Sequence, residues 1–115
     1  MPSQDDLAAL QKAFYSLYNS LNEAYYAAST EEAKDQIHGA KDLVNQVLDM
    51  IDQADIEADN AAIASLTQAL NASIKNLSDL QKDLEAIVHN VGIASTAVQA
   101  IDSALTVAGK IAAAV

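Results

Sequence analysis

Apolar residues recur at alternating steps of three and four in four stretches of this sequence, and that spacing constrains the fold more than any other feature. It places the apolar side chains on one face of a helix, and such a seam, sustained over several heptads, packs against other helices. No stretch alternates with the two-residue period of a strand, and the single proline is at position 2. The sequence therefore predicts an all-α protein.

The four seams predict helices over about residues 3–28, 30–54, 58–91 and 94–113. The first seam contains Leu7, Leu10, Phe14, Leu17, Leu21, Ala24 and Ala28. The second contains Ala33, Ile37, Ala40, Val44, Val47, Ile51 and Ala54. The third contains Ile63, Leu66, Leu70, Ser73, Leu77, Leu80, Leu84, Ile87 and Val91. The fourth contains Val98, Ile101, Leu105, Ala108 and Ala112, and Ile111 and Val115 widen its apolar face.

Residues that favour helix ends separate these seams. The candidate N-caps are, in chain order, Ser3, Ser29 in a capping box with Glu32, Asp55 or Asp59, and Ser95 or Thr96. Gly92 directly follows the third seam and is a candidate C-cap. Because short connections join antiparallel neighbours, we expect one domain over residues 1–115, an up-down-up-down antiparallel four-helix bundle. The alternative is three long helices with a fourth that docks loosely.

Two residues do not fit the helices that contain them. Ser73 is a polar interruption in the third apolar seam. Gly39 lies inside the second helix, where glycine costs about 1 kcal/mol relative to alanine. A close helix crossing would explain Gly39, and simple tolerance is the alternative.

The charge of the chain is strongly acidic and unevenly distributed. The chain contains sixteen acidic residues and six lysines, arginine is absent, and the net charge is −10. Residues 31–60 hold nine of the acids and two of the lysines. No basic patch is present, so binding to nucleic acid or, by charge, to anionic lipid is not expected. A basic protein partner fits this charge, and solubility alone is the simpler explanation.

Catalytic motifs are missing from the sequence. There is no cysteine, no glycine-rich phosphate loop and no G-x-S-x-G sequence. The chain is therefore expected not to be an enzyme and to carry no cofactor.

Metal-binding patterns fail at their diagnostic positions. His38 and His89 lack the Glu-x-x-His spacing and the inward-facing glutamates of di-iron bundles. The acids of residues 55–59 alternate as the first ligands of a calcium-binding EF-hand loop do, but Asn60 replaces its glycine and Leu66 its final glutamate. No metal site is predicted.

All four tyrosines, Tyr15, Tyr18, Tyr25 and Tyr26, lie within twelve residues of the first predicted helix. Tyrosine at the edge of a core buries its ring and hydrates its hydroxyl, which is the simpler interpretation. The alternative is a contact patch, because tyrosine is enriched at protein interfaces. The candidate partner surface combines these tyrosines with acids of the second helix: Tyr15, Tyr18, Tyr25, Tyr26, Asp42, Asp49 and Asp52.

The C-terminal segment, residues 93–115, is rich in alanine and carries two charges, Asp102 and Lys110. Its alanines at four-residue steps (Ala100, Ala104, Ala108 and Ala112) would allow a close helix approach. No run of about 18 uncharged apolar residues exists, so an ordinary membrane-spanning helix is not expected.

These observations lead to two main hypotheses of function, with a small-ligand or metal-binding bundle as a third. The first is a non-catalytic protein-interaction module, such as an adaptor, an inhibitor or immunity-type protein, or an assembly subunit. The second is a membrane-active protein, such as a subunit of a pore-forming assembly, that uses residues 93–115. The sequence leaves homo-oligomers open, since seams can also close between chains. The N-terminal stretch MPSQDDLAAL lacks signal-peptide features, so we expect a cytoplasmic location and leave export without a signal peptide open.

Overall fold

The computed structural model describes residues 4–52 and 60–114, and these residues form four helices joined by short connections. In chain order they are α1 (Gln4–Ala27), α2 (Glu31–Asp52), α3 (Asn60–Ile87) and α4 (Val91–Ala114). The predicted all-α class and four-helix organisation are confirmed. The expected caps Ser3, Asp55 and Asp59 lie outside the described residues.

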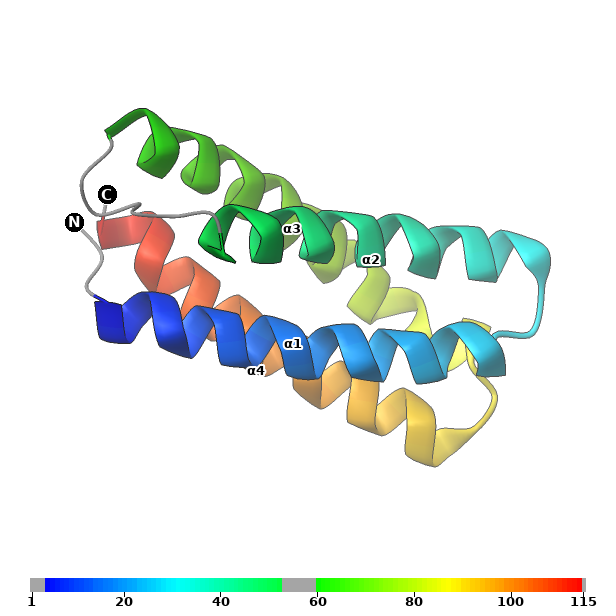
Figure 1. The fold of residues 1–115 in the computed structure, drawn as a ribbon. Coiled ribbons are helices and arrows are strands. Elements are labelled where there is room, and N and C mark those ends of the chain that lie inside the picture. Colours follow the sequence, from blue (N-terminus) through cyan, green and yellow to red (C-terminus); the bar gives the residue numbers. More distant parts are fainter. Residues whose placement is uncertain (1–3, 53–59, 115) are drawn as a thin grey trace.

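The helices form an antiparallel bundle in which each helix packs on its neighbours in the sequence and α4 packs back on α1 (Figure 1). The bundle measures 44 × 20 × 19 Å. The α1–α2 and α3–α4 connections lie together at one end, and the first turn of α1 and the last turn of α4 lie at the other (Figure 1). The fourth helix is thus a full wall of the bundle, which excludes the alternative of a loosely docked segment.

The two connections at the shared end are joined by backbone hydrogen bonds. Ala28 and Val88 form an isolated antiparallel bridge. The backbone N–H of Ser29 donates to the carbonyl of Ile87 at 3.0 Å, and the Ser29 hydroxyl donates to the same carbonyl at 2.9 Å. This clip ties the end of α1 to the end of α3, although 58 residues separate the bonded groups in the chain.

The predicted caps at this end are wrong. Thr30 caps α2, since its hydroxyl accepts from the N–H of Ala33 at 3.1 Å, whereas Ser29 is used in the clip. Asn90 caps α4, since its side-chain oxygen accepts from the N–H of Ile93 at 3.1 Å. Helix α3 therefore ends at Ile87 and α4 begins at Val91, which places Gly92 inside α4 instead of at a C-cap. Because Asn90 caps α4 in the connection, the helix begins before Gly92, and the glycine does not end α3 as the sequence predicted.

The core follows the predicted seams in the first three helices. The buried residues of α1 and α2 are Leu10, Phe14, Leu17, Leu21, Ala24, Ala33, Ile37, Ala40, Val44, Val47 and Leu48. From α3 and the connection after it come Leu66, Leu70, Ser73, Leu77, Leu80, Leu84 and Val88. The predicted third seam is wrong at its end, because the chain turns after Ile87 and leaves Val91 81 % exposed.

The buried face of α4 is rotated relative to the predicted one. Ile101, Ala108 and Ile111 are buried as expected, but the other buried residues are Ala94, Ala97 and Ala104. Val98, Leu105 and Ala112 lie partly buried at the edges of this face. Small side chains toward the core let α4 approach its neighbours closely, while the larger Val98 and Leu105 cover the boundary. The prediction weighted residue size and so missed this rotation.

The polar interruption of the third seam, Ser73, is fully buried. Its hydroxyl oxygen has no hydrogen-bond partner among the described residues. The seam therefore stays buried through this position, and the core contains a polar group that is not satisfied there.

Candidate interaction surfaces

The tyrosines of α1 divide into two classes. Tyr18 and Tyr25 are partly buried and pack against the core. Tyr15 and Tyr26 are 46 % and 80 % exposed. The ring of Tyr26 meets the ring of Tyr25 edge-on, with the centroids 5.4 Å apart. The row is therefore both a boundary of the core and a set of exposed rings.

The two lysines of α2 lie over this tyrosine row. Lys41 Nζ is 5.4 Å from the ring centroid of Tyr18 and 5.2 Å from that of Tyr25. Lys34 Nζ is 5.7 Å from the centroid of Tyr25. Lys34 and Lys41 are seven residues apart in α2, and Tyr18 and Tyr25 are seven residues apart in α1, so each pair lies on one side of its helix. These are cation–π contacts, and they turn both ammonium groups of α2 toward α1.

The acids of α2 lie on its outer side. Asp35, Asp42 and Asp49 are exposed and also spaced by seven, so their backbone positions are about 10 Å apart along the helix. Among the described residues of α2, the one ion pair joins His38 Nε2 to Asp42 Oδ2 at 3.6 Å. The side chain of Asp52, the last acid of the predicted surface, lies outside the described residues. The carboxylates of this ridge thus have no lysine partner within α2.

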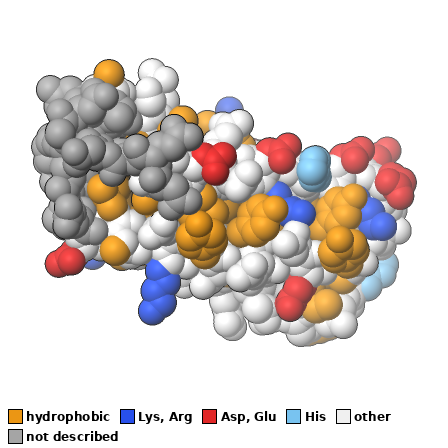
Figure 2. Space-filling view, viewed as in Figure 1, with side chains coloured by type: hydrophobic (Ala, Val, Ile, Leu, Met, Phe, Trp, Pro, Cys, Tyr) orange, Lys and Arg blue, Asp and Glu red, His pale blue; other side chains and the backbone are white. Residues whose placement is uncertain are grey.

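The structure brings the predicted tyrosines and the predicted acids Asp42 and Asp49 onto adjacent strips of one face. Figure 2 shows this face, with orange side chains along the α1–α2 boundary, blue lysine side chains between them and red acids on the α2 side. We call Tyr15, Tyr18, Tyr25, Tyr26 and the ridge of Asp35, Asp42 and Asp49 the α1–α2 surface. Sequence reasoning missed the two lysines, although their spacing of seven matches that of Tyr18 and Tyr25.

Gly39 lies on the exposed ridge between Asp35 and Asp42. A Cβ atom built at this position meets nothing within 4 Å. A close crossing with another helix of this chain therefore does not explain the glycine.

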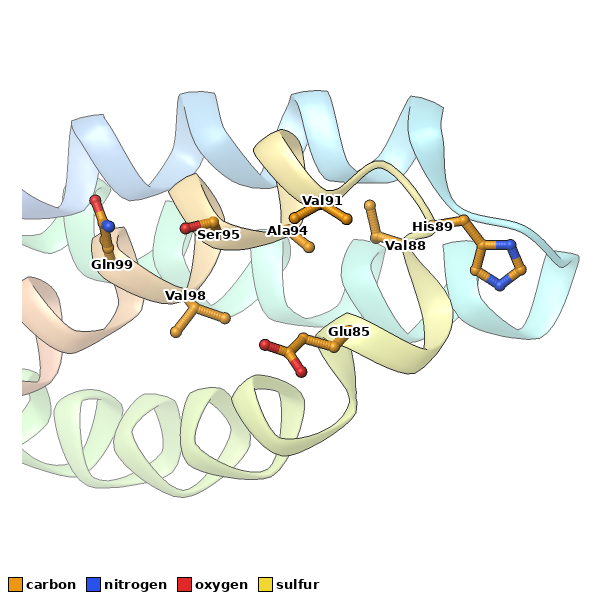
Figure 3. A pocket seen from close by; sticks show the side chains of 8 residues that line it. All are labelled: Glu85, Val88, His89, Val91, Ala94, Ser95, Val98 and Gln99. Carbon is orange, nitrogen blue, oxygen red and sulfur yellow. The ribbon is translucent and has the colours of Figure 1, made fainter.

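A hollow of about 550 Å³ lies between the end of α3 and the start of α4 (Figure 3). Val88 and Ala94, both almost fully buried, contribute to its apolar lining together with Val98. The polar side chains around it are those of Glu85, His89, Ser95 and Gln99. The Glu85 carboxylate extends from α3 toward Val98, whereas the ring of His89 points away from the other labelled side chains (Figure 3). Sequence reasoning missed this hollow, which exists because α3 ends early.

Within residues 4–52 and 60–114, no three side chains of the His, Asp and Glu types gather where they could hold a metal ion. His38 contacts Asp42 and the ring of Tyr25, whose centroid is 6.3 Å from its own. The acids of residues 55–59, which alternate as the first ligands of a calcium-binding loop do, lie outside the described part of the chain.

Helix α4 has the length and apolar composition of a membrane-spanning helix over Val91–Ala113. The core helix of a soluble protein meets the same criterion when most of it is buried, and 28 % of this window is buried inside the bundle. Here Ile101, Ala104 and Ala108 are fully buried against the other helices.

Comparison of the chain with protein-family models, with curated proteins and with solved structures finds no match.

Proposed function

We propose that this chain is a non-catalytic interaction module that binds a basic protein partner through the α1–α2 surface. The observation that carries the proposal is the position of Lys34 and Lys41. Their ammonium groups lie over tyrosine rings, so they leave the outer carboxylates of α2 without lysine partners. The exposed carboxylates of Asp35 and Asp49 are available to the lysines and arginines of a partner, and that of Asp42, which lies 3.6 Å from His38 Nε2, is exposed between them.

The two strips of the surface have complementary roles in this proposal. The acids of α2 attract a basic partner and raise its association rate, as complementary charge does at other interfaces. Exposed aromatic rings supply the contact area that holds a partner once it has arrived. Tyr26 is the main candidate for such an anchor because 80 % of its surface is exposed.

The exposed Gly39 supports the same surface. A mid-helix glycine costs about 1 kcal/mol relative to alanine, and no packing within the chain requires it. Without a side chain between Asp35 and Asp42, a partner can approach the backbone of α2 closely.

Site-specific photocrosslinking in the native cells tests the proposal. A photoreactive residue replaces Tyr26, and in a matched control it replaces Thr106, which is exposed on α4. The expected result is one defined crosslinked protein with a basic surface, obtained from position 26 and absent from position 106. The crosslink should weaken when Asp42 and Asp49 are both changed to asparagine. Equal crosslinking from both positions, or a partner without a basic surface, would contradict the proposal.

A membrane-active role is the second candidate, and the apolar composition of α4 favours it. Insertion of α4 would have to expose a core that now surrounds Ile101, Ala104 and Ala108. Flotation with neutral phosphatidylcholine vesicles at pH 7 and pH 5 tests this role, because protonation of the carboxylates lowers the charge that opposes insertion. Co-flotation at either pH would support it, and its absence at both would remove it.

A further inference from the structure

The hollow between α3 and α4 has the apolar lining of a small ligand site. Its volume of about 550 Å³ is within the range of small-molecule pockets in proteins. Val88 and Ala94 are held in place by the core, with 1 % and 3 % of their surface exposed. Val91, 81 % exposed, belongs to the same lining. A short aliphatic chain would remove the apolar surface of Val91 and of the partly buried Val98 from water.

Glu85 supplies the charge of this hollow. Within the described residues its carboxylate forms no ion pair, either with Lys82 one turn earlier or with His89 one turn later. The carboxylate extends from α3 toward Val98 (Figure 3). Glu85 is exposed, so water screens its charge, and we expect a cation placed there to be held about fivefold more tightly than a neutral group.

The charge of the lining favours a cation over an anion. The hydroxyl of Ser95 and the amide of Gln99 can each accept and donate hydrogen bonds, so Glu85 alone distinguishes an ammonium group from an anion. The one side chain of the lining that can become cationic, His89, points away from the others (Figure 3). A carboxylate or phosphate ligand would meet Glu85 without compensation.

We propose that this hollow binds a primary alkylammonium group, with its aliphatic chain against Val88, Val91 and Val98 and its ammonium group at Glu85. A free aliphatic amine and the side chain of a lysine share this chemistry. The site is on the α3–α4 side of the bundle and does not depend on the α1–α2 surface or its partner.

Titration followed by NMR of the methyl groups tests the proposal on the full chain. The ligands are n-pentylamine, n-pentanol and pentanoate. Pentylamine should shift the methyl signals of Val88, Ala94 and Val98 and bind about fivefold more tightly than pentanol. Pentanoate should not shift them. Equal binding of the amine and the alcohol, or shifts of other methyl groups alone, would overturn the proposal.

Two charge variants separate the site from general attraction of amines to an acidic protein. Glu85→Gln removes the proposed partner, and Asp79→Asn removes the same charge from another exposed position of α3. Glu85→Gln should weaken pentylamine binding about fivefold, and Asp79→Asn should leave it unchanged. Equal weakening by both would show that net charge causes the binding and would overturn the site.

A third variant tests the apolar lining, and a further ligand identifies the source of the amine. Pentylamine has a longer chain than propylamine, and each additional methylene that is fully covered strengthens binding by at most about fourfold. Val91→Ser should reduce this difference in affinity between the two amines. A lysine blocked at its amino and carboxyl groups should bind as well as pentylamine if the natural ligand is a protein side chain. Binding of pentylamine without the blocked lysine indicates a free amine. Binding of neither contradicts the proposal.

Discussion

The ammonium group of Lys41 lies 5.2 Å from the centroid of the Tyr25 ring, and this contact joins the acidic helix α2 to the aromatic helix α1. Lys34 approaches the same ring at 5.7 Å. The contacts have two consequences. They stabilise the packing of α1 on α2, and they remove two lysines from the neighbourhood of the acids of α2. A local packing interaction thus determines the charge that the outer face of α2 presents.

Replacement of Lys41 by glutamine should destabilise the bundle by about 0.5–1 kcal/mol, because the cation–π contacts with Tyr18 and Tyr25 are lost. Urea unfolding measures the change. Lys75→Gln on the exposed side of α3 is the matched control, and it should change the free energy of unfolding by less than about 0.5 kcal/mol. If both variants lose the same stability, the tyrosine contacts contribute nothing measurable.

Ser73→Ala should stabilise the bundle by about 1 kcal/mol. The Ser73 hydroxyl oxygen is buried and has no hydrogen-bond partner, so its removal abolishes a desolvation cost. Ser73→Leu should instead destabilise the bundle by about 1–3 kcal/mol, since position 73 is fully buried and a larger side chain would overpack the core. Denaturant unfolding of the two variants measures both changes. A stabilising leucine would show that the core has free space at position 73.

Gly39→Ala and Gly109→Ala should each raise the free energy of unfolding by about 1 kcal/mol, because alanine loses less backbone entropy in a helix. Neither new methyl group meets an atom within 4 Å in the structure. The glycines lie in different helices, α2 and α4, so the two gains should add in the double variant. Thermal unfolding of the single and double variants checks both statements. A loss of stability at position 39 would show that the helix needs the glycine.

Asn90→Ala should cost about 1 kcal/mol of stability, because the side chain that accepts from the N–H of Ile93 is lost. Ser95→Ala should have little effect, since Ser95 lies inside α4 and not at its N-cap. The two variants, compared by thermal unfolding, identify the first turn of the helix. A larger effect at Ser95 would return the start of α4 to the predicted position near residue 94.

Hydrogen exchange should find the amide of Ser29 protected, although this residue is exposed and lies in a connection. Its N–H donates to the carbonyl of Ile87 at 3.0 Å. Ser29→Ala should leave that backbone bond in place and lose the hydroxyl bond to the same carbonyl, at a cost of about 0.5–1.5 kcal/mol. Rapid exchange of the Ser29 amide in the native chain would mean that the clip does not persist in solution.

The sequence by itself determined the number, type and order of the helices and most of the core. The seams through Phe14, Val44 and Leu77 are long enough that one face of each helix must be buried, whatever its neighbours are. The tyrosines and the acids Asp42 and Asp49 could be chosen as a candidate surface because helical periodicity places them outside the buried seams.

Tertiary structure decided what depends on two helices at once. The rotation of α4 toward Ala97 and Ala104 follows from how closely it packs on its neighbours, which its own periodicity does not contain. The clip of Ser29 to Ile87 joins two connections that are distant in the chain, and it occupies the hydroxyl that the sequence assigned to a helix cap. The contacts of Lys34 and Lys41 with the tyrosine rings depend on the position of α2 relative to α1 along the bundle axis. That relative position results from the packing of side chains across the interface between the two helices, and the sequence of one helix alone does not determine it.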